Sequence, residues 1–451
     1  MLPFGERLEA LLRIADRCAV SRGYPGEGRT LEVAAASVEE DAVHRVVVRG
    51  ARVLDGTGRD PVGERDVIVE DGRLTAIQAS GAPLRADIVV DAAGATLLPG
   101  LTDAHVHLGL VGAPPKPQGE GSLVDYALLV RALIERTLHE GFTTVRDAGG
   151  LDPAWARAVA AGRIRGPRIL PSGSFLTQTG GHGDARAAHE AVHGLASIPG
   201  LVANPEVVDG ADAVRRAARE QLRRGATQIK LFVSGGVMSP TDPLESIQFT
   251  VEEIAAAVEV ARSWGTYVLV HAHTSPAMRN ALAAGARSIE HASILDEETA
   301  RQILAAGAFV VPTLLIVTRL PPLGPAETAK ATLVAGASRA SVGLAHAHGI
   351  PLGSGSDLVG VDQAGRAGEI VEKAREIGPM AAIVSATRVN AELFGRADRI
   401  GTVEPGKDAD LILVRGDPLE RIETIAEPDG VPFVLQRGEV VRNDEDRASA
   451  A

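Results

Sequence analysis

One short unit recurs through the middle of this 451-residue chain, and it constrains the fold more than any other feature. A helical stretch ends at a glycine, and a short apolar run follows that ends in a polar residue. Glycine commonly ends helices in the left-handed conformation, and short apolar runs between turn signals predict buried strands. The six instances are Gly141-FTTVRD, Gly225-ATQIKLF, Gly265-TYVLVHAH, Gly285-ARSIEHAS, Gly307-AFVVPT and Gly349-IPLGSGSD.

This recurrence predicts a parallel sheet, because strands that alternate with helices pair in the same direction. Two further stretches have strand character, LLPGLTDAHVH (97–107) and GPRILPSG (166–173), which brings the strand candidates to eight. Eight such units match an α/β fold of the (β/α)8 TIM-barrel type. An open doubly wound sheet is the alternative, but no glycine-rich phosphate-binding fingerprint follows an early strand, which weighs against it.

Both ends of the chain carry a different pattern. Residues 45–98 contain short β-branched runs broken by Gly turns, which predicts an antiparallel meander, and residues 408–417 and 431–441 repeat the style. We therefore expect three parts, namely an N-terminal extension (1–44), a small β-sandwich domain formed by both chain ends (45–98 with 399–445), and a barrel (99–398).

Composition and charge exclude several classes of protein. The only cysteine is Cys18, which rules out an intrachain disulfide and any metal site built from several cysteines. The net charge of −12 disfavours nucleic acid as a partner, because nucleic-acid binding needs a cationic surface. The longest nearly apolar stretch, 303–317, is too short to span a bilayer. We expect a cytoplasmic protein that binds neither nucleic acid nor membrane.

Ligand-capable side chains stand at the ends of most predicted strands. In a barrel of this type the active site lies at the C-terminal ends of the strands, and residues i and i+2 of a strand face the same way. A single histidine, lysine or aspartate at such a place is usually structural, but their coincidence predicts a metal site. The residues concerned are His105, His107, Lys230, His271, His273, Glu290, His291 and Asp357.

The types of these residues indicate which metal they hold. Imidazole and carboxylate ligands without thiolate suit zinc, and also manganese, cobalt, nickel or iron. Two metal ions about 3.5–4 Å apart need a bridging ligand. Lys230 cannot bridge two cations as an amine, but it can after carbamylation by CO2, because the carbamate is an anion with two oxygens.

These motifs, in this order, resemble the amidohydrolase superfamily. HVH after LLPGLTDA, the strand-four lysine, HAH, EHAS and SGSD carry the resemblance, and it covers about residues 45–445. GFTTVRDAGG, LTQTGGHGD, REQLRRGATQIKLFVSGGVMSP and GARSIEHASILD are similar to the prolidase-like branch, which includes Xaa-Pro dipeptidases and ochratoxinase. SGSD departs mildly from the Gly-Thr-Asp that many relatives have.

The resemblance implies a role for each matched residue. His105, His107 and Asp357 would bind one metal ion, and His271 and His291 would bind the other. Lys230, as a carbamate, would bridge the two ions, for which zinc is the expected metal. Asp357 would also accept a proton from the water that bridges the metals and pass it to the leaving amine. His182 and His273 match positions that contact substrate.

The function expected from these observations is hydrolysis of an amide bond in a small molecule, such as a dipeptide or an N-acyl amino acid. A hydrolase of a carbamate, urea, lactone or cyclic amide is the alternative within the superfamily. A deaminase and a non-catalytic, assembly-forming relative are weaker alternatives, since deaminases with one metal generally lack the strand-four lysine and assembly-forming relatives have lost ligands. Relatives often assemble, so a homo-oligomer is expected.

Overall fold

The structure is a computed structural model, and it describes residues 44–92, 94–112, 122–184, 186, 197–239, 242–320 and 323–444. The predicted N-terminal extension (1–44), apart from His44, lies outside these ranges, as does Cys18. None of the described helices is both long enough and apolar enough to cross a membrane.

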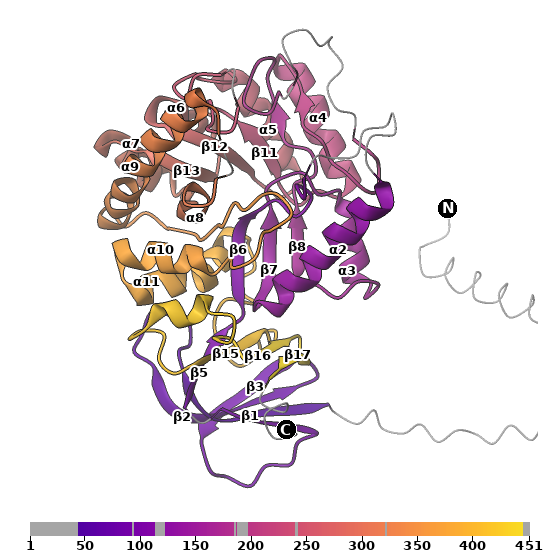
Figure 1. The fold of residues 1–451 in the computed structure, drawn as a ribbon, viewed down its shortest axis with the longest axis vertical. Coiled ribbons are helices and arrows are strands. Elements are labelled where there is room, and N and C mark those ends of the chain that lie inside the picture. The colour runs from indigo at the N-terminus through magenta and orange to yellow at the C-terminus, as the bar shows by residue number, and fades with distance from the viewer. Residues whose placement is uncertain are drawn as a thin grey trace, which may run out of the picture. The chain divides into compact units, whose positions relative to one another are not determined.

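Strands and helices alternate through the middle of the chain, as the recurring unit predicts (Figure 1). The strands form two sheets in which every pair is parallel, β6-β7-β8 and β10-β9-β11-β12-β13-β14. The elements are β6 (Leu101–Val106), α2 (Leu123–His139), β7 (Phe142–Asp147), α3 (Pro153–Ala160), β8 (Arg168–Pro171), β9 (Leu176–Thr177), β10 (Glu206–Val207), α4 (Ala211–Arg224), β11 (Ile229–Phe232), α5 (Val251–Ser263), β12 (Val268–Thr274), α6 (Ser275–Ala284), β13 (Ser288–Ile294), α7 (Glu297–Ala306), β14 (Phe309–Val311), α8 (Leu314–Val317), α9 (Pro325–Ala347), α10 (Gly368–Ile377), α11 (Pro379–Val384), a π-helical turn (Ser385–Val389) and α12 (Asn390–Leu393).

The junction glycines adopt the conformation that the sequence pattern requires. Gly225, Gly285 and Gly307 cap α4, α6 and α7 in the left-handed conformation. The other three, Gly141, Gly265 and Gly349, also have positive φ angles. A residue with a side chain would be strained at these places, which explains why glycine recurs between helix and strand.

The eighth predicted strand differs from the others, because residues 350–357 form only an isolated bridge between Val310 and Leu352. The segment still bonds to a neighbour on each side. The Gly353 amide donates to the Val310 carbonyl (2.8 Å), and the Ala104 amide donates to the Ser354 carbonyl (2.7 Å). A side chain at Gly355 would overlap His105. Glycine allows this close approach, but it also reduces the regular pairing that defines a strand.

Both ends of the chain contribute to one further sheet, in the order β17-β16-β15-β5-β1-β2-β3 with β4 beside β1. Its strands are β1 (Arg45–Val53), β2 (Val62–Glu70), β3 (Arg73–Ala79), β4 (Ile88–Asp91), β5 (Ala95–Pro99), β15 (Leu411–Arg415), β16 (Phe433–Gln436) and β17 (Glu439–Asn443), with a 3-10 helix (Ile422–Ala426) between β15 and β16.

The predicted antiparallel meander is right for β1, β2 and β3 but wrong for β4 and β5, which pair with β1 in parallel. Strand β1 has nine residues; its first half pairs with β4 and its last two residues pair with β5. Its length therefore provides an edge for two short strands. From β5 the chain enters β6 after a single residue, Gly100.

Candidate metal centre and substrate pocket

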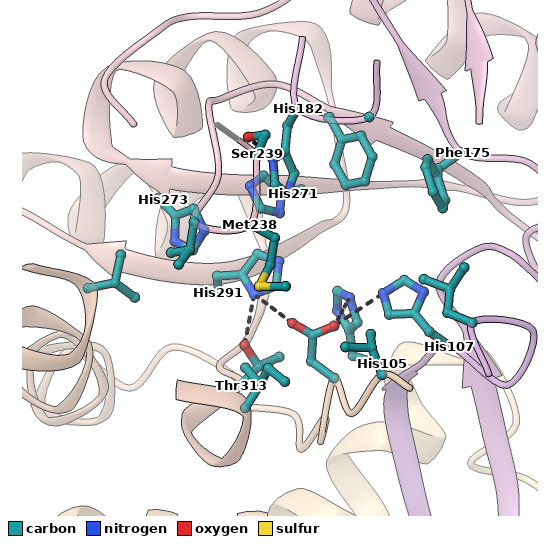
Figure 2. Close-up of a pocket in the computed structure, with 18 of the residues that line it drawn as sticks. His105, His107, Phe175, His182, Met238, Ser239, His271, His273, His291 and Thr313 are labelled. Carbon is teal, nitrogen blue, oxygen red and sulfur yellow. Dashed lines mark hydrogen bonds and ion pairs between the residues drawn. The ribbon is translucent and has the colours of Figure 1, made fainter. Parts of the chain in front are cut away.

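A cavity of about 580 Å³ lies where the parallel strands end, and the predicted site residues meet there (Figure 2). Its polar lining includes His105, His107, His182, His271, His273, His291 and Asp357. Its apolar lining includes Leu110, Phe175, Phe232, Val237, Met238, Ile316, Val317, Leu320, Val334 and Val359. Of the eight residues to which the resemblance gives a role, only Lys230 is absent from the surface of the cavity, because it is fully buried on β11. Glu290, the other residue predicted at a strand end, is fully buried as well.

Asp357 stands at the centre of one group of ligand atoms. Its Oδ1 lies 3.2 Å from Nε2 of His107 and 3.5 Å from Nε2 of His105, and its Oδ2 lies 3.8 Å from Nδ1 of His291. His105, His291 and Asp357 each offer one ligand atom, and these three atoms lie within 4.8 Å of one another. Burial alone would raise the pKa of Asp357, but the nearby His105 and His107 outweigh it and lower that pKa.

Asp103 joins the two segments that carry this group. One of its oxygens accepts hydrogen bonds from the backbone amides of His105 and Ser356, both at 3.0 Å, and the other accepts from the Ser356 hydroxyl. The Asp357 amide in turn donates to the His105 carbonyl (2.8 Å) and holds Asp357 at a φ of 55°. Aspartate tolerates this conformation better than most residues. Ser356, the second serine of SGSD, fixes the segment through its two hydrogen bonds to Asp103.

Glu290 sets the orientation of His105. Nδ1 of His105 lies 2.7 Å from a Glu290 oxygen, and both oxygens of Glu290 accept hydrogen bonds from Arg146 at 2.8 Å. The carboxylate only accepts, so His105 carries its proton on Nδ1 and directs an unprotonated Nε2 toward Asp357. Burial would raise the pKa of Glu290, but Arg146 and His105 lower it to about 2. Carboxylates in this position commonly orient metal-binding histidines.

We expect Glu290→Gln to lower the free energy of unfolding by about 3 kcal/mol, because it leaves the fully buried Arg146 guanidinium without its counter-charge. Urea denaturation of the metal-free protein measures the change. The control is Glu297→Gln, which removes an exposed carboxylate paired with His348, and is expected to change the free energy by less than about 0.5 kcal/mol. Equal effects of the two substitutions would contradict the stabilising role of this ion pair.

Two buried nitrogen atoms at the site lack a hydrogen-bond partner among the described residues, Nζ of Lys230 and Nε2 of His291. Burial lowers the pKa of Lys230 to about 8. Polar atoms buried in proteins almost always have a partner, so a pair of exceptions at one place fits a site that takes an additional group. The donor set of imidazoles, one carboxylate and a lysine amine fits divalent metal ions.

The histidines form a continuous cluster around these atoms. The ring of His271 lies 4.5 Å from that of His291, 4.6 Å from that of His273 and 4.6 Å from that of His182, between centroids. Burial lowers the pKa of His105 and of His182 to about 4 and that of His273 to about 3. These three rings are therefore neutral near pH 7, which is the form that binds metals. Burial would lower the pKa of His107 too, but the carboxylates of Asp357 and Asp147 outweigh it and raise that pKa instead.

Sequence reasoning missed several residues that hold the cluster in place. Thr313 lies 2.8 Å from Nδ1 of His291, and Ser293 lies 2.9 Å from Nδ1 of His273. Ser239 lies 2.7 Å from Nδ1 of His182. Thr313 is the polar residue that follows β14 in the recurring unit, so its position had a signal in the sequence. Ser239 had none, because it lies in a loop whose path the strand pattern does not predict.

Comparison with known proteins connects this geometry to a family. The model of the Amidohydrolase family matches residues 96–441. The chain belongs to the amidohydrolase family. Amidohydrolases of this kind are enzymes that hydrolyse carbon–nitrogen bonds, and the family is generally dependent on metal ions.

Individual relatives place the chain in the prolidase- and ochratoxinase-like branch of the amidohydrolases. Ochratoxinase from Aspergillus niger is 32% identical over 369 residues, which are 77% of this chain and 75% of the relative. A crystal structure of a prolidase in complex with N-methylphosphonate-L-proline is 36% identical, with a TM-score of 0.82 over 88% of this chain and 100% of that one. A Xaa-Pro dipeptidase structure with bound methionine is 29% identical, with a TM-score of 0.77 over 88% and 99%.

Proposed function

We propose that this amidohydrolase uses two divalent metal ions to hydrolyse an amide bond in a small molecule, such as a dipeptide or an N-acyl amino acid. The observation that carries the proposal is the buried amine of Lys230, which has no hydrogen-bond partner among the described residues and lies close to the cluster of histidines and Asp357. Relatives named as an ochratoxinase, a prolidase and a Xaa-Pro dipeptidase support an amide as the substrate.

The proposed ligands divide into two sets that share Lys230. His105, His107 and Asp357 would hold one ion, for which their mutual distances of 3.2 and 3.5 Å are suitable. His271 and His291 would hold the other, and a carbamate on Lys230 would contact both. We propose zinc as the metal. When bound, such ions activate water at neutral pH and polarise the carbonyl of the substrate.

Asp357 is the proposed proton carrier. Among the described residues it is the one carboxylate that lies close to all three of His105, His107 and His291, and its lowered pKa keeps it ionised at neutral pH, as a group that accepts a proton must be. It would take a proton from the attacking water and return it to the departing amine, the dual role that a general base and acid plays. His182 and His273 would contact the substrate at the rim of the same cavity.

The fold that we propose for the catalytic part is a closed (β/α)8 barrel. Backbone hydrogen bonds support closure at both gaps between the two parallel sheets. Residues 351–357 bond to β14 and to β6, and the Thr227 amide donates to the Pro171 carbonyl (2.8 Å) between β11 and β8. We also propose that the barrel spans 99–398 and that 45–98 with 399–445 form a β-sandwich.

Removal and return of metal tests the proposed chemistry. We expect the chelated enzyme to lose turnover of N-acyl amino acids and Xaa-Pro dipeptides, and zinc to restore it, because the proposed site activates water only through its bound metal ions. Mass spectrometry of metals should then find two ions per chain. Full turnover with less than about one ion per chain would contradict a two-metal site. Turnover of carbamates, ureas or lactones alone would favour the alternative substrates.

A further inference from the structure

The seam between β6 and the eighth strand segment (residues 350–357) joins the two parts of the chain that carry the proposed ligands of one metal ion. Backbone hydrogen bonds cross this seam where the Ala104 amide donates to the Ser354 carbonyl (2.7 Å) and where the Asp357 amide donates to the His105 carbonyl (2.8 Å). On its other side the segment forms an isolated bridge to β14 instead of a regular ladder. Its position therefore depends on side chains that bond to its backbone.

The carboxamide of Asn390 takes the place of a neighbouring strand at Ser354. Asn390 is fully buried on α12, and its Oδ1 accepts a hydrogen bond from the Ser354 amide (3.0 Å). Its Nδ2 donates to the Ser354 carbonyl (2.9 Å) and to the Thr102 carbonyl on β6 (3.2 Å). Backbone amides only donate and carbonyls only accept, so these partners fix the orientation of the carboxamide. One side chain thus bonds to both polar backbone groups of Ser354 and to β6.

Gly353 makes room for this contact. A Cβ atom at Gly353 would lie 2.7 Å from Oδ1 of Asn390, and its φ angle is not one that favours glycine. Glycine is therefore needed here for the close approach of the carboxamide and not for its conformational freedom. Gly353 and Gly355 together admit Asn390 and His105, respectively, to the backbone of the segment.

The helical segment that carries Asn390 is also anchored to β6 by a second contact. The π-helical turn Ser385–Val389 comes immediately before Asn390. The Thr102 hydroxyl donates to the Ala386 carbonyl of this turn (2.7 Å), while the Thr102 carbonyl accepts from Asn390. π-Helical turns are rare and occur frequently at functional sites. Here the helical segment contacts Thr102 with a carbonyl of the turn and with the side chain that follows the turn.

We propose that Asn390 is a positioning residue, which holds the Ser354 backbone to β6 and thereby holds Asp357 at its distances of 3.5 and 3.2 Å from His105 and His107. Asn390 is not among the described residues that line the cavity, so it acts through the backbone and not on the substrate. The inference rests on the proposed function, because it assigns Asn390 to the ligands of one proposed ion. It predicts that loss of Asn390 loosens the seam while the protein stays folded.

Hydrogen exchange of the full-length protein tests this role without turnover. In Asn390→Ala, the amides of residues 352–358, followed by mass spectrometry of peptic peptides, should exchange at least about tenfold faster than in the native protein, because the buried Ser354 amide loses its hydrogen-bond partner. Asn390→Asp keeps the size of the side chain and the acceptor for that amide, but it turns an oxygen toward two carbonyls. It should accelerate exchange of the same amides, although it leaves no empty space.

Ile254→Ala is the matched control for a general loss of stability. Ile254 is fully buried on α5, which packs against α4 and β11, so its truncation lowers the stability of the protein away from the seam. All variants are compared at the same interval below their own melting temperatures. Ile254→Ala should then leave the exchange of residues 352–358 unchanged relative to the rest of the chain.

Zinc affinity and kinetics connect the seam to the site. Competition with a chromophoric chelator should show zinc binding that is about 10- to 100-fold weaker in Asn390→Ala, and kcat should fall by a similar factor. KM should change by less than about threefold, because Asn390 acts outside the cavity. Ile254→Ala should keep the native zinc affinity and kcat.

Two results would overturn the inference, namely native exchange of residues 352–358 in Asn390→Ala, or native zinc affinity in that variant. Failure of the native enzyme to bind zinc or to hydrolyse any amide would count against the proposed function instead. The exchange measurement would still decide whether Asn390 holds the segment to β6.

Discussion

Lys230→Ala is expected to lose more than about 100-fold in kcat, the upper range for loss of a residue that only supports a metal ligand. The amine is fully buried and has no hydrogen-bond partner among the described residues, and in the proposed site its carbamate would contact both ions. Without it, four histidines and one carboxylate must hold two dications, so the metal content should fall toward one ion per chain. Steady-state kinetics and metal analysis on the same preparation measure both changes.

Small carboxylates provide a specific control for this result. Formate or acetate fits the space that Lys230→Ala leaves and supplies two oxygens, so we expect millimolar concentrations to restore part of the activity and the second ion. Lys230→Met fills the space with a side chain of similar volume and should resist this rescue. A Lys230→Ala enzyme that turns over substrate normally without added carboxylate would refute the bridging role of this residue.

Lys230 also illustrates how function and stability oppose each other at this site. An amine without a partner in the interior destabilises the folded state. Five of the histidines around it are buried as well, and burial lowers their pKa values. The terminal nitrogens of two other buried cations have partners. Arg146 bonds to Glu290, and Lys373 bonds to the Gly353 carbonyl at 2.6 Å. The contrast marks Lys230 as a residue kept for chemistry rather than for folding.

Much of the fold followed from local chemistry that a sequence displays directly. The six junction glycines predicted where helices end and strands begin, because a left-handed cap is a local requirement. The parallel pairing of β4 and β5 with β1 was not predictable in the same way. It depends on the length of β1 and on which segments compete for its edge, and neither property is visible in a short β-branched run.

The candidate site divides along the same line. Residues at strand ends, such as His105, His271 and His291, were predicted to converge, because a parallel arrangement brings the ends of all strands to one place. Ser239 was not predicted, because it lies in an irregular loop and contacts Nδ1 of His182 from 57 positions away in the sequence. Contacts of this kind depend on the path of the loop, which only the assembled structure defines.

Asp357→Asn is expected to reduce kcat by about 100- to 10,000-fold, the contribution typical of a general base and acid, while the protein remains folded. Asparagine is the best replacement, because Asp357 has a φ of 55° and asparagine is one of the few residues that adopts such an angle readily. The amide keeps the size of the carboxylate but can no longer accept a proton from water. Its loss of charge also weakens metal binding at His105 and His107, which lie 3.5 and 3.2 Å away.

Two measurements separate these effects of Asp357→Asn. Circular dichroism and thermal unfolding should resemble those of the native protein, and metal analysis at saturating zinc should show how much of the lost activity reflects an empty ligand position. Asp362→Asn changes an exposed carboxylate, with 83% of its side chain accessible, in the segment that follows, and should retain both activity and metal. If Asp357→Asn kept both ions and hydrolysed amides at the native rate, the proton would have to travel by another route. His105, His107 and His291 would then be the side chains to test, because they surround that carboxylate.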